Sequence, residues 1–516
     1  MTKKETNFMK TKRIGDIRTE CSAEISLPDY NTDVRKILHY SAKPHPISSF
    51  ASAEGIECSG EVSFEVVYLD FEGVVCSATF EGDYSFKVKC DTGSYKDSLV
   101  ETELAGMSLR LMSPRKIAAR AMLNSCVTVI SEATVCIDGD AFNSELNPQV
   151  DSVLISAEHT ALTPPAEREY GLSLARFDGK TTDEVHLIYL SAKPIVERLE
   201  VSNGEAEITG RIEISALIRT DECPLYRLEK SIELSQKIQL EEGLSDGDIR
   251  PVIEIVSSSI ATEGDEGGVE MTLSIITETR LICRRNVEEE LVGDIYLCQC
   301  SCECSNESFV YEEYLGHFTS QKEINEKIAL ADIGAGKLRE VNFADVSCEV
   351  KEVERDGDTV VVKGDIKVSA IASEIKNDGD VELVPLKFTV NFVENVNCDC
   401  QIDEKTTINA DASIVGSSLT CDSDNAYIKV CLLVDLFVLE QREVDIVTSA
   451  NAVFTDPYLV NPSRVSVYYP AEGDTLYTIA KAYHTTREKL LADNPLAANT
   501  FARGDDLSSV GRLIIT

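Results

Sequence analysis

The chain has 516 residues, 43% of them hydrophobic and 27% charged, and its formal net charge is −40. This apolar content is ordinary for a globular protein and excludes a chain that is disordered throughout. The negative charge argues against binding to nucleic acid or to anionic lipid, because both need a basic face, and it favours a basic protein partner. The length predicts three to four domains.

The N-terminus and the most apolar segment bear on localisation. Basic residues such as Lys10 and Arg13 are not followed by an apolar core, so we expect no secretion signal. The segment from Tyr427 to Leu439 is interrupted by Lys429 and Asp435, whereas a membrane span needs about 20 nearly uncharged residues. The 17 cysteines are odd in number and scattered, which fits reduced thiols. We therefore expect a cytoplasmic protein without a membrane span.

The sequence repeats itself at intervals of about 150 residues. Ser41–Pro44 recurs as Ser191–Pro194, and Gly60, Gly210 and Gly364 each precede a run of alternating apolar and polar residues. Further along, Ile255–Ile260 aligns with Ile414–Leu419, and in the same register residues 269–279 align with residues 428–438. We therefore predict three homologous units.

The alternation within each unit is typical of β-strands. Val62, Phe64 and Val66 alternate with polar residues, and the other two copies do the same. A glycine inside such a run predicts a β-bulge or a close backbone approach. We predict a mainly β protein with three tandem antiparallel units of sandwich or open-barrel type. The expected domains are residues 1–150, 151–305, 306–456 and 457–516.

The last domain has a different pattern, β-α-α-β. A short strand is expected at 465–469 and a second at 513–515. Between them, Leu476, Ile479, Ala480 and Tyr483 fall on one helical face, and a second helix starting at Thr485 is ended by the Asn-Pro pair at 494–495.

These residues resemble a LysM module. The match is carried by the Gly-Asp-Thr-Leu-x-x-Ile-Ala run at 473–480 and by the Asn-Pro pair. LysM modules usually hold N-acetylglucosamine chains in a groove between the first turn and the loop after the second helix. The resemblance implies that this groove involves Gly473, Asp474, Thr475, Leu476, Asn494, Pro495, Leu496, Ala497 and Ala498. For Leu476, we favour a purely structural role in the fold of the module over a role in the groove. The stretch from Arg503 to Thr516 departs from the usual pattern, which leaves affinity for the glycan open.

The repeat units resemble the SPOCS domain of spore-forming Firmicutes. The matching stretches are Pro28–Leu38, Gly60–Tyr68 and Ser113–Arg120, and the first unit matches best. SPOCS repeats followed by one C-terminal LysM module are the layout of spore-coat morphogenetic proteins. The resemblance implies a protein at the forespore surface in the mother-cell cytoplasm, with a SpoIVA-like coat morphogenetic ATPase as its partner.

No pattern supports catalysis, a cofactor or a metal. A phosphate-binding loop at Lys337 is rejected because Ala331 and Leu338 stand where glycine and Ser or Thr are needed. No Gly-x-Ser-x-Gly run occurs, and no two of the six histidines lie four residues apart. We therefore expect a protein that is not an enzyme.

One local oddity is the run Cys298, Cys300, Cys302 and Cys304. A metal or redox cluster is one interpretation. We favour a strand with the cysteines facing inward, because alternate residues lie about 6.6 Å apart and four of them cannot reach one ion. We expect no bound metal.

Two functional hypotheses remain. The first is a non-enzymatic scaffold of spore envelope assembly, which recruits a protein through its LysM module. The second is a cell-wall protein whose LysM module binds peptidoglycan.

Overall fold

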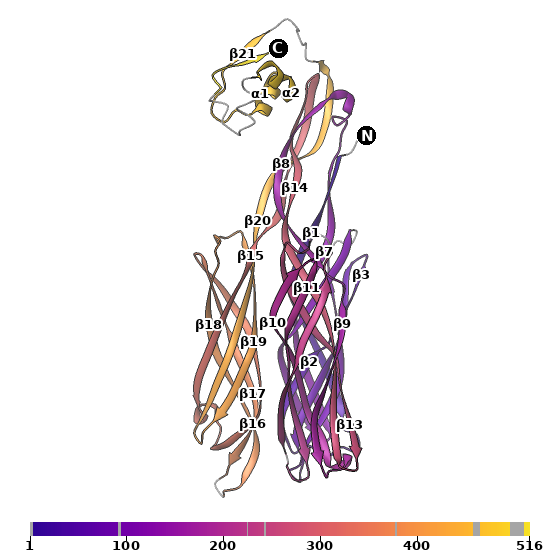
Figure 1. The fold of residues 1–516 in the computed structure, drawn as a ribbon, viewed down its shortest axis with the longest axis vertical. Helices are drawn as coiled ribbons and strands as arrows, with labels where there is room; N and C mark the ends of the chain where they lie inside the picture. The colour runs from indigo at the N-terminus through magenta and orange to yellow at the C-terminus, as the bar shows by residue number, and fades with distance from the viewer. Residues whose placement is uncertain are drawn as a thin grey trace.

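The computed structural model describes residues 4–90, 94–223, 225–241, 244–376, 379–457, 465–495 and 510–516. Antiparallel sheets make up most of the described chain, and the two α-helices lie near the C-terminus, so the predicted mainly β fold class is confirmed. Figure 1 shows a broad body of long strands, a narrower stalk rising from it, and a small C-terminal module at the end of the stalk.

The first unit consists of two packed sheets. One has the order β1-β7-β6, and in the other β2 and β3 follow one edge of β4 while β5 pairs with its other edge. The strands are β1 (Lys4–Ser26), β2 (Lys36–Pro44), β3 (Ser48–Ser52), β4 (Gly55–Leu69), β5 (Val75–Val88), β6 (Tyr95–Ser113) and β7 (Lys116–Ile137).

The second unit repeats this arrangement. Here β8 and β9 both pair with β14 and β13 lies on its other side, while β10-β11-β12 form the second sheet. The strands are β8 (Pro148–Leu162), β9 (Ala166–Asp178), β10 (Val185–Ser202), β11 (Glu205–Thr220), β12 (Tyr226–Gln239), β13 (Asp248–Asp265) and β14 (Gly268–Leu297).

The third unit has the sheets β15-β20-β19 and β16-β17-β18. Its strands are β15 (Cys300–Ala329), β16 (Leu338–Asp356), β17 (Thr359–Ile375), β18 (Val381–Asn397), β19 (Thr406–Cys421) and β20 (Asn425–Pro457). Short 3-10 turns, η1 (Ser144–Leu146), η2 (Thr182–Glu184) and η3 (Leu330–Ile333), lie between strands. The expected boundaries after residues 150 and 305 fall inside β8 and β15, because each unit begins with a strand that pairs along its own last strand.

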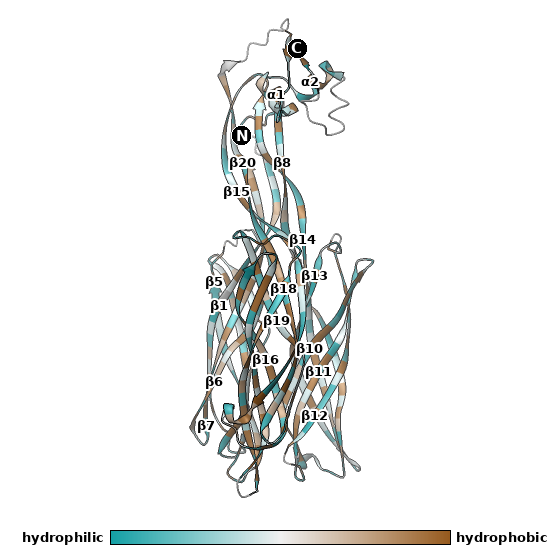
Figure 2. Ribbon diagram, turned by 90° about the vertical axis from the view of Figure 1, so that its left-hand side faces the viewer, coloured by the Kyte–Doolittle hydropathy of each residue, from teal (hydrophilic) through white to brown (hydrophobic). Residues whose placement is uncertain are grey.

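Alternating burial explains why these segments form sandwiches. In β17, every second residue from Val360 to Ala370 is buried against the facing sheet, and the hydropathy colours of Figure 2 alternate along the strands in the same way. The expected glycines lie in the equivalent central strands β4, β11 and β17. A Cβ on Gly210 would lie 2.1 Å from the carbonyl oxygen of Ile195, beside a register shift, so this position needs glycine because of a close backbone approach.

Three aromatic rings join the three units. His39, Tyr189 and Phe343 lie in β2, β10 and β16, and each follows a register shift at the same place in its strand. Their ring centroids are 5.2, 5.1 and 5.0 Å apart, and every pair is edge-to-face. Val67, Leu217 and Ile371, which stand opposite these rings in the central strands, complete the cluster. The units therefore meet around a pseudo-threefold axis.

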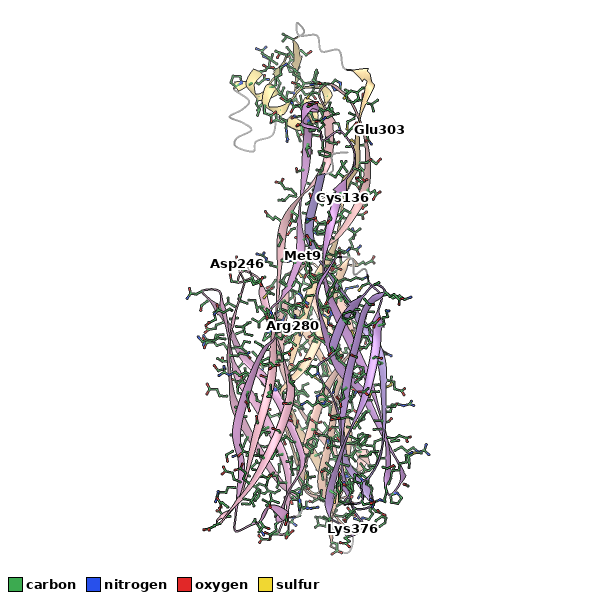
Figure 3. The ribbon with its side chains drawn as sticks, turned by 90° about the vertical axis from the view of Figure 1, so that its right-hand side faces the viewer. Met9, Cys136, Asp246, Arg280, Glu303 and Lys376 are labelled. Carbon is green, nitrogen blue, oxygen red and sulfur yellow. The ribbon has the colours of Figure 1, made fainter. Side chains whose placement is uncertain are left out.

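The stalk continues the same symmetry upward. We define it by residues 4–14 with 127–137, 148–157 with 287–297, and 300–311 with 442–457, which form three antiparallel strand pairs. Apolar residues of all three pairs fill its interior, among them Ile137, Ile295 and Val447. In Figure 3, Met9, Cys136 and Glu303 lie along the stalk, whereas Lys376 lies at the opposite end of the molecule.

The aromatic cluster predicts a loss of stability in acid. Burial lowers the pKa of His39 from 6.5 to about 4, although nearby Asp345 opposes the shift. Nδ1 of His39 lies 3.0 Å from Oγ of Ser369, and its buried Nε2 has no hydrogen-bond partner among the described residues. The folded state therefore needs neutral His39. Its contribution is complete above pH 6.5 and is lost as the pH falls toward 4, at a cost of about 3 kcal/mol.

We expect His39→Phe to reduce this acid sensitivity, because Phe keeps the edge-to-face contacts and cannot be protonated. The measurement is urea unfolding of the wild type and of His39→Phe between pH 7.5 and pH 4. The control is His186→Phe, which replaces a histidine of β10 in the second unit. Equal pH dependence of the wild type and His39→Phe would contradict the assignment.

Candidate functional site

The C-terminal module is the predicted functional element. It consists of β21 (Ser466–Tyr468), α1 (Leu476–Ala482), α2 (Arg487–Asp493) and β22 (Leu513–Ile515), with β21 antiparallel to β22. The predicted order β-α-α-β is therefore confirmed. None of the helices in the described ranges is long and apolar enough to span a bilayer.

Threonine caps define both short helices. Oγ1 of Thr475 accepts a hydrogen bond from the backbone N–H of Thr478 at 3.1 Å, and Oγ1 of Thr486 accepts one from Lys489 at 3.1 Å. Ile479, Leu490 and Leu513 are buried between the helices and the two-stranded sheet. These residues build the fold of the module.

The module is fixed to the end of the stalk. The Tyr296 hydroxyl of β14 donates to the carbonyl oxygen of Thr485 at 2.7 Å, and the Tyr296 and Tyr477 rings are 5.2 Å apart. Lys481 forms an ion pair with Asp294. Burial raises the pKa of the Tyr296 hydroxyl, so it stays protonated and can donate.

A second contact comes from α2. The Arg487 guanidinium donates to the carbonyl oxygen of Val150 in β8 at 2.9 Å and lies over the Tyr477 ring. The stalk thus contacts α1, the turn between the helices, and the start of α2. None of Tyr477, Lys481, Thr485 and Arg487, which make these contacts, belongs to the predicted groove residues.

The structure gives the predicted groove residues unequal roles. Gly473 is exposed with a φ of 88°, which a turn before α1 requires. Oδ2 of Asp474 accepts hydrogen bonds from the Tyr468 hydroxyl and from the Ala471 N–H, both at 2.7 Å. Asp474 therefore closes its own turn.

Asn494 is the most deeply buried of the predicted polar residues, with 8% of its surface exposed. Its Nδ2 donates to the carbonyl oxygens of Leu490 (2.8 Å) and Ile514 (2.6 Å), and its Oδ1 accepts from the Ile514 N–H at 2.7 Å. These bonds join α2 to β22, so Asn494 supports the fold.

The remaining groove residues fall into two groups. Thr475 and Pro495 are exposed, while Leu476 is half-buried and packs against the module core. Leu496, Ala497 and Ala498 lie outside the described residues. Of the predicted set, Gly473, Thr475 and Pro495 are the described residues with an exposed surface.

Sequence reasoning missed the outer face of the module's sheet. Val467 and Ile514 stand directly opposite each other on β21 and β22, and Val465 and Tyr469 flank them. All four are exposed, Tyr469 to 69%. The alternation of Val465, Val467 and Tyr469 was the signal that could have revealed this face.

Two of the SPOCS-like stretches meet at the other end of the molecule. The Arg115 guanidinium donates to the Asp33 carboxylate at 2.9 Å and to the carbonyl oxygen of Pro28 at 2.8 Å, with longer bonds to Leu27 and Asn31. This clamp orders a loop whose Tyr30 is 89% exposed.

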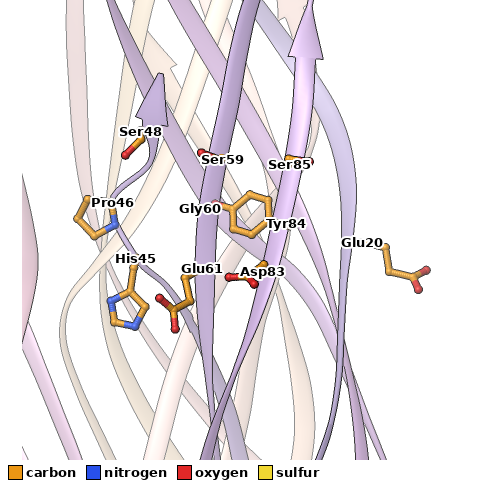
Figure 4. A pocket seen from close by; sticks show the side chains of 10 residues that line it. All are labelled: Glu20, His45, Pro46, Ser48, Ser59, Gly60, Glu61, Asp83, Tyr84 and Ser85. Carbon is orange, nitrogen blue, oxygen red and sulfur yellow. The ribbon is translucent and has the colours of Figure 1, made fainter. Parts of the chain in front are cut away.

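A surface hollow lies on the first unit. It has a volume of about 650 Å³ and is open to solvent, and Figure 4 shows His45, Glu61 and Asp83 around Gly60. A hydrogen bond with Glu81 raises the pKa of Glu61, which is expected where two carboxyl groups meet. Nε2 of His45 lies 2.6 Å from Oγ of Ser63.

The cysteine run spans a turn and a strand. Cys300, Cys302 and Cys304 lie on β15 and face the stalk core, as predicted, but Cys298 lies in the turn after β14. The expectation of one strand through all four is therefore wrong at Cys298, because the chain reverses there to start the third unit. In the part of the chain that the structure describes, no three His, Cys, Asp or Glu side chains are placed to hold a metal ion.

Comparison with known proteins identifies the module. Residues 471–501 match the LysM domain family. No curated protein and no solved structure matches the chain significantly. The chain thus contains a LysM domain, which suggests binding of peptidoglycan or a related glycan.

The hydrogen bonds of Asn494 predict that its role is structural. We expect Asn494→Ala to destabilise the module by about 2–3 kcal/mol, because it leaves backbone groups of Ile514 without partners. Hydrogen exchange of α1, α2 and β22 in the full chain measures this loss, with the exposed Pro495→Ala as the control. Unchanged protection in Asn494→Ala would contradict the structural role.

The contacts of Tyr296 predict how firmly the module is attached. We expect Tyr296→Ala to release the module from the stalk, because it removes both the ring packing and the bond to Thr485. Small-angle scattering should show a broader range of module positions, while Tyr296→Phe, which loses the hydroxyl alone, should resemble the wild type. A Tyr296→Ala protein with unchanged scattering would show that the interface does not depend on this ring.

Proposed function

We propose that this protein is a non-enzymatic scaffold of spore envelope assembly that recruits a protein partner through its LysM module. The observation that carries the proposal is the fixed attachment of the module at the end of a long stalk. The contacts of Tyr296, Lys481 and Arg487 hold it there, while Gly473, Thr475 and Pro495 stay exposed. A stalk with a fixed terminal module suits a protein that bridges two surfaces.

The polar groups near the groove favour a protein over a sugar. Oδ2 of Asp474 and the amide of Asn494 are bonded within the module. Sugar recognition needs hydrogen-bonding groups that are free to meet hydroxyls, whereas a protein interface draws much of its energy from a few buried apolar contacts. The exposed apolar face of β21 and β22 extends the available surface.

The charge of the chain indicates the kind of partner. A net charge of −40 would speed the encounter with a basic protein surface more than it would tighten the complex. By the SPOCS resemblance, we propose a SpoIVA-like coat morphogenetic ATPase, met at the forespore surface in the mother-cell cytoplasm. The many free thiols agree with a reducing compartment.

The second candidate function is glycan binding through the same groove. The match of residues 471–501 to the LysM domain family favours it. The two proposed functions differ in the ligand that the module binds. Both use a module that is attached to the stalk in the same way.

The test compares both ligands on the full chain. We expect the coat ATPase to bind in biolayer interferometry, at a rate that falls as salt rises, and N-acetylglucosamine oligomers to give no heat in calorimetry. A chain that ends after Pro457, and therefore lacks the LysM module, should no longer bind the ATPase. Micromolar binding of the oligomers without ATPase binding would replace the scaffold by the glycan-binding function.

Two matched variants locate the contact. Pro495→Arg and Val467→Arg each add one guanidinium to an exposed residue, the first beside the groove and the second on the outer face of the sheet. We expect Pro495→Arg to weaken ATPase binding at least tenfold and Val467→Arg to act less. If Val467→Arg weakens ATPase binding more than Pro495→Arg does, the ATPase contacts the outer face of the sheet and not the groove.

A further inference from the structure

The upper stalk contains two thiols in direct contact. Cys302 and Cys304 are neighbours on the inward face of β15, and their Sγ atoms are 3.5 Å apart. Both are half-buried, and the labelled Glu303 in Figure 3 marks their place just below the module. Their partners in β20 are Ala452 and Ala450, which both have small side chains.

We infer that Cys302 and Cys304 form a dithiol site that a low-molecular-weight disulfide of the glutathione class converts reversibly into an intrachain disulfide. The thiolate of Cys304 attacks one sulfur of the reagent, forms a mixed disulfide and releases the first small thiol. Cys302 then loses its proton to solvent, attacks Sγ of Cys304 and releases the second. Two protein thiols and one reagent disulfide thus become one protein disulfide and two small thiols.

The order of the steps follows from the surroundings of the two sulfurs. Burial and the neighbouring thiols raise the pKa of Cys302 to about 12, so it is a poor first nucleophile. It becomes effective once Cys304 carries the mixed disulfide, because the second attack is intramolecular across a 3.5 Å contact.

Strand geometry makes the disulfide reversible. Alternate Cα atoms of a strand lie about 6.6 Å apart, and disulfides span Cα separations of about 4.4–6.8 Å. A bridge from Cys302 to Cys304 therefore forms at the upper limit and draws the strand together. Strained disulfides of this kind are easily reduced.

The site also touches the interface that holds the module. Sγ of Cys304 donates to the carbonyl oxygen of Ile295 at 3.7 Å, and Ile295 lies between Asp294 and Tyr296, which contact Lys481 and Thr485. Disulfide formation removes this thiol donor and moves β15 beside the interface. Oxidation should therefore loosen the module.

The experiment uses the full, reduced chain and oxidised glutathione. After alkylation of free thiols, a protease that cleaves after Glu303 separates Cys302 from Cys304, so the two fragments stay joined only by a disulfide. We expect the joined fragments in most chains, and their separation after dithiothreitol. Free, alkylated Cys302 and Cys304 in glutathione-treated protein would overturn the inference.

Serine variants distinguish the pair from its neighbours. Cys302→Ser should abolish the joined fragments, and Cys300→Ser, which alters the adjacent inward cysteine, should retain them. If the joined fragments are lost in Cys300→Ser and retained in Cys302→Ser, the disulfide involves Cys300, and the inference for Cys302 and Cys304 is overturned. Circular dichroism of both variants confirms that each is folded.

Hydrogen exchange tests the link to the module. In oxidised wild type, peptides of α1 and α2 should exchange faster than in the reduced protein, while glutathione-treated Cys302→Ser should show no change. Equal exchange in the oxidised and reduced wild type would overturn the coupling to the interface.

Discussion

The edge-to-face packing of His39, Tyr189 and Phe343 is the contact on which the rest of the structure depends. Each ring comes from a different unit and lies at an equivalent place in its sequence, directly after a register shift. Aromatic pairs have preferred geometries, so three rings packed against one another also fix the angles between the units that carry them. Long strands then extend this arrangement along the axis in both directions. A histidine at one corner makes the contact sensitive to pH, since a protonated ring would be buried among two aromatic side chains.

The stalk follows from the same arrangement. Because the three units surround one axis, the strand pairs that extend beyond the body converge, and their apolar faces close a narrow core lined by residues such as Ile137, Ile295 and Val447. The end of this core is where β14 turns into β15. Tyr296 and Asp294 before the turn hold the module, and Cys302 and Cys304 after it lie in contact. The residues that attach the module and the thiol pair therefore lie in one short segment of the chain.

The residues of the predicted groove also have structural tasks within the module. The Gly-Asp-Thr-Leu run and the Asn-Pro pair do flank the two helices, and the match to the LysM domain family covers them. Yet Asp474 closes a turn with Tyr468 and Ala471, and Asn494 joins α2 to β22. Polar residues of a small module must satisfy the backbone groups that its short elements leave unpaired. A residue typical of the family can therefore serve the fold rather than a ligand.

The sequence by itself determined the mainly β class, the repeated glycines of β4, β11 and β17 and the order of elements in the module. These features depend on local periodicity and on turn residues, which a single segment carries. It could not place His39 beside Phe343, bring Arg115 to the loop of Tyr30, or set the stalk against α1 and α2. The alternating cysteines also predicted one strand that includes Cys298, whereas this residue lies in the turn between β14 and β15. Those contacts join residues far apart in the chain, and only the packing of whole sheets decides which of many apolar and charged side chains become neighbours.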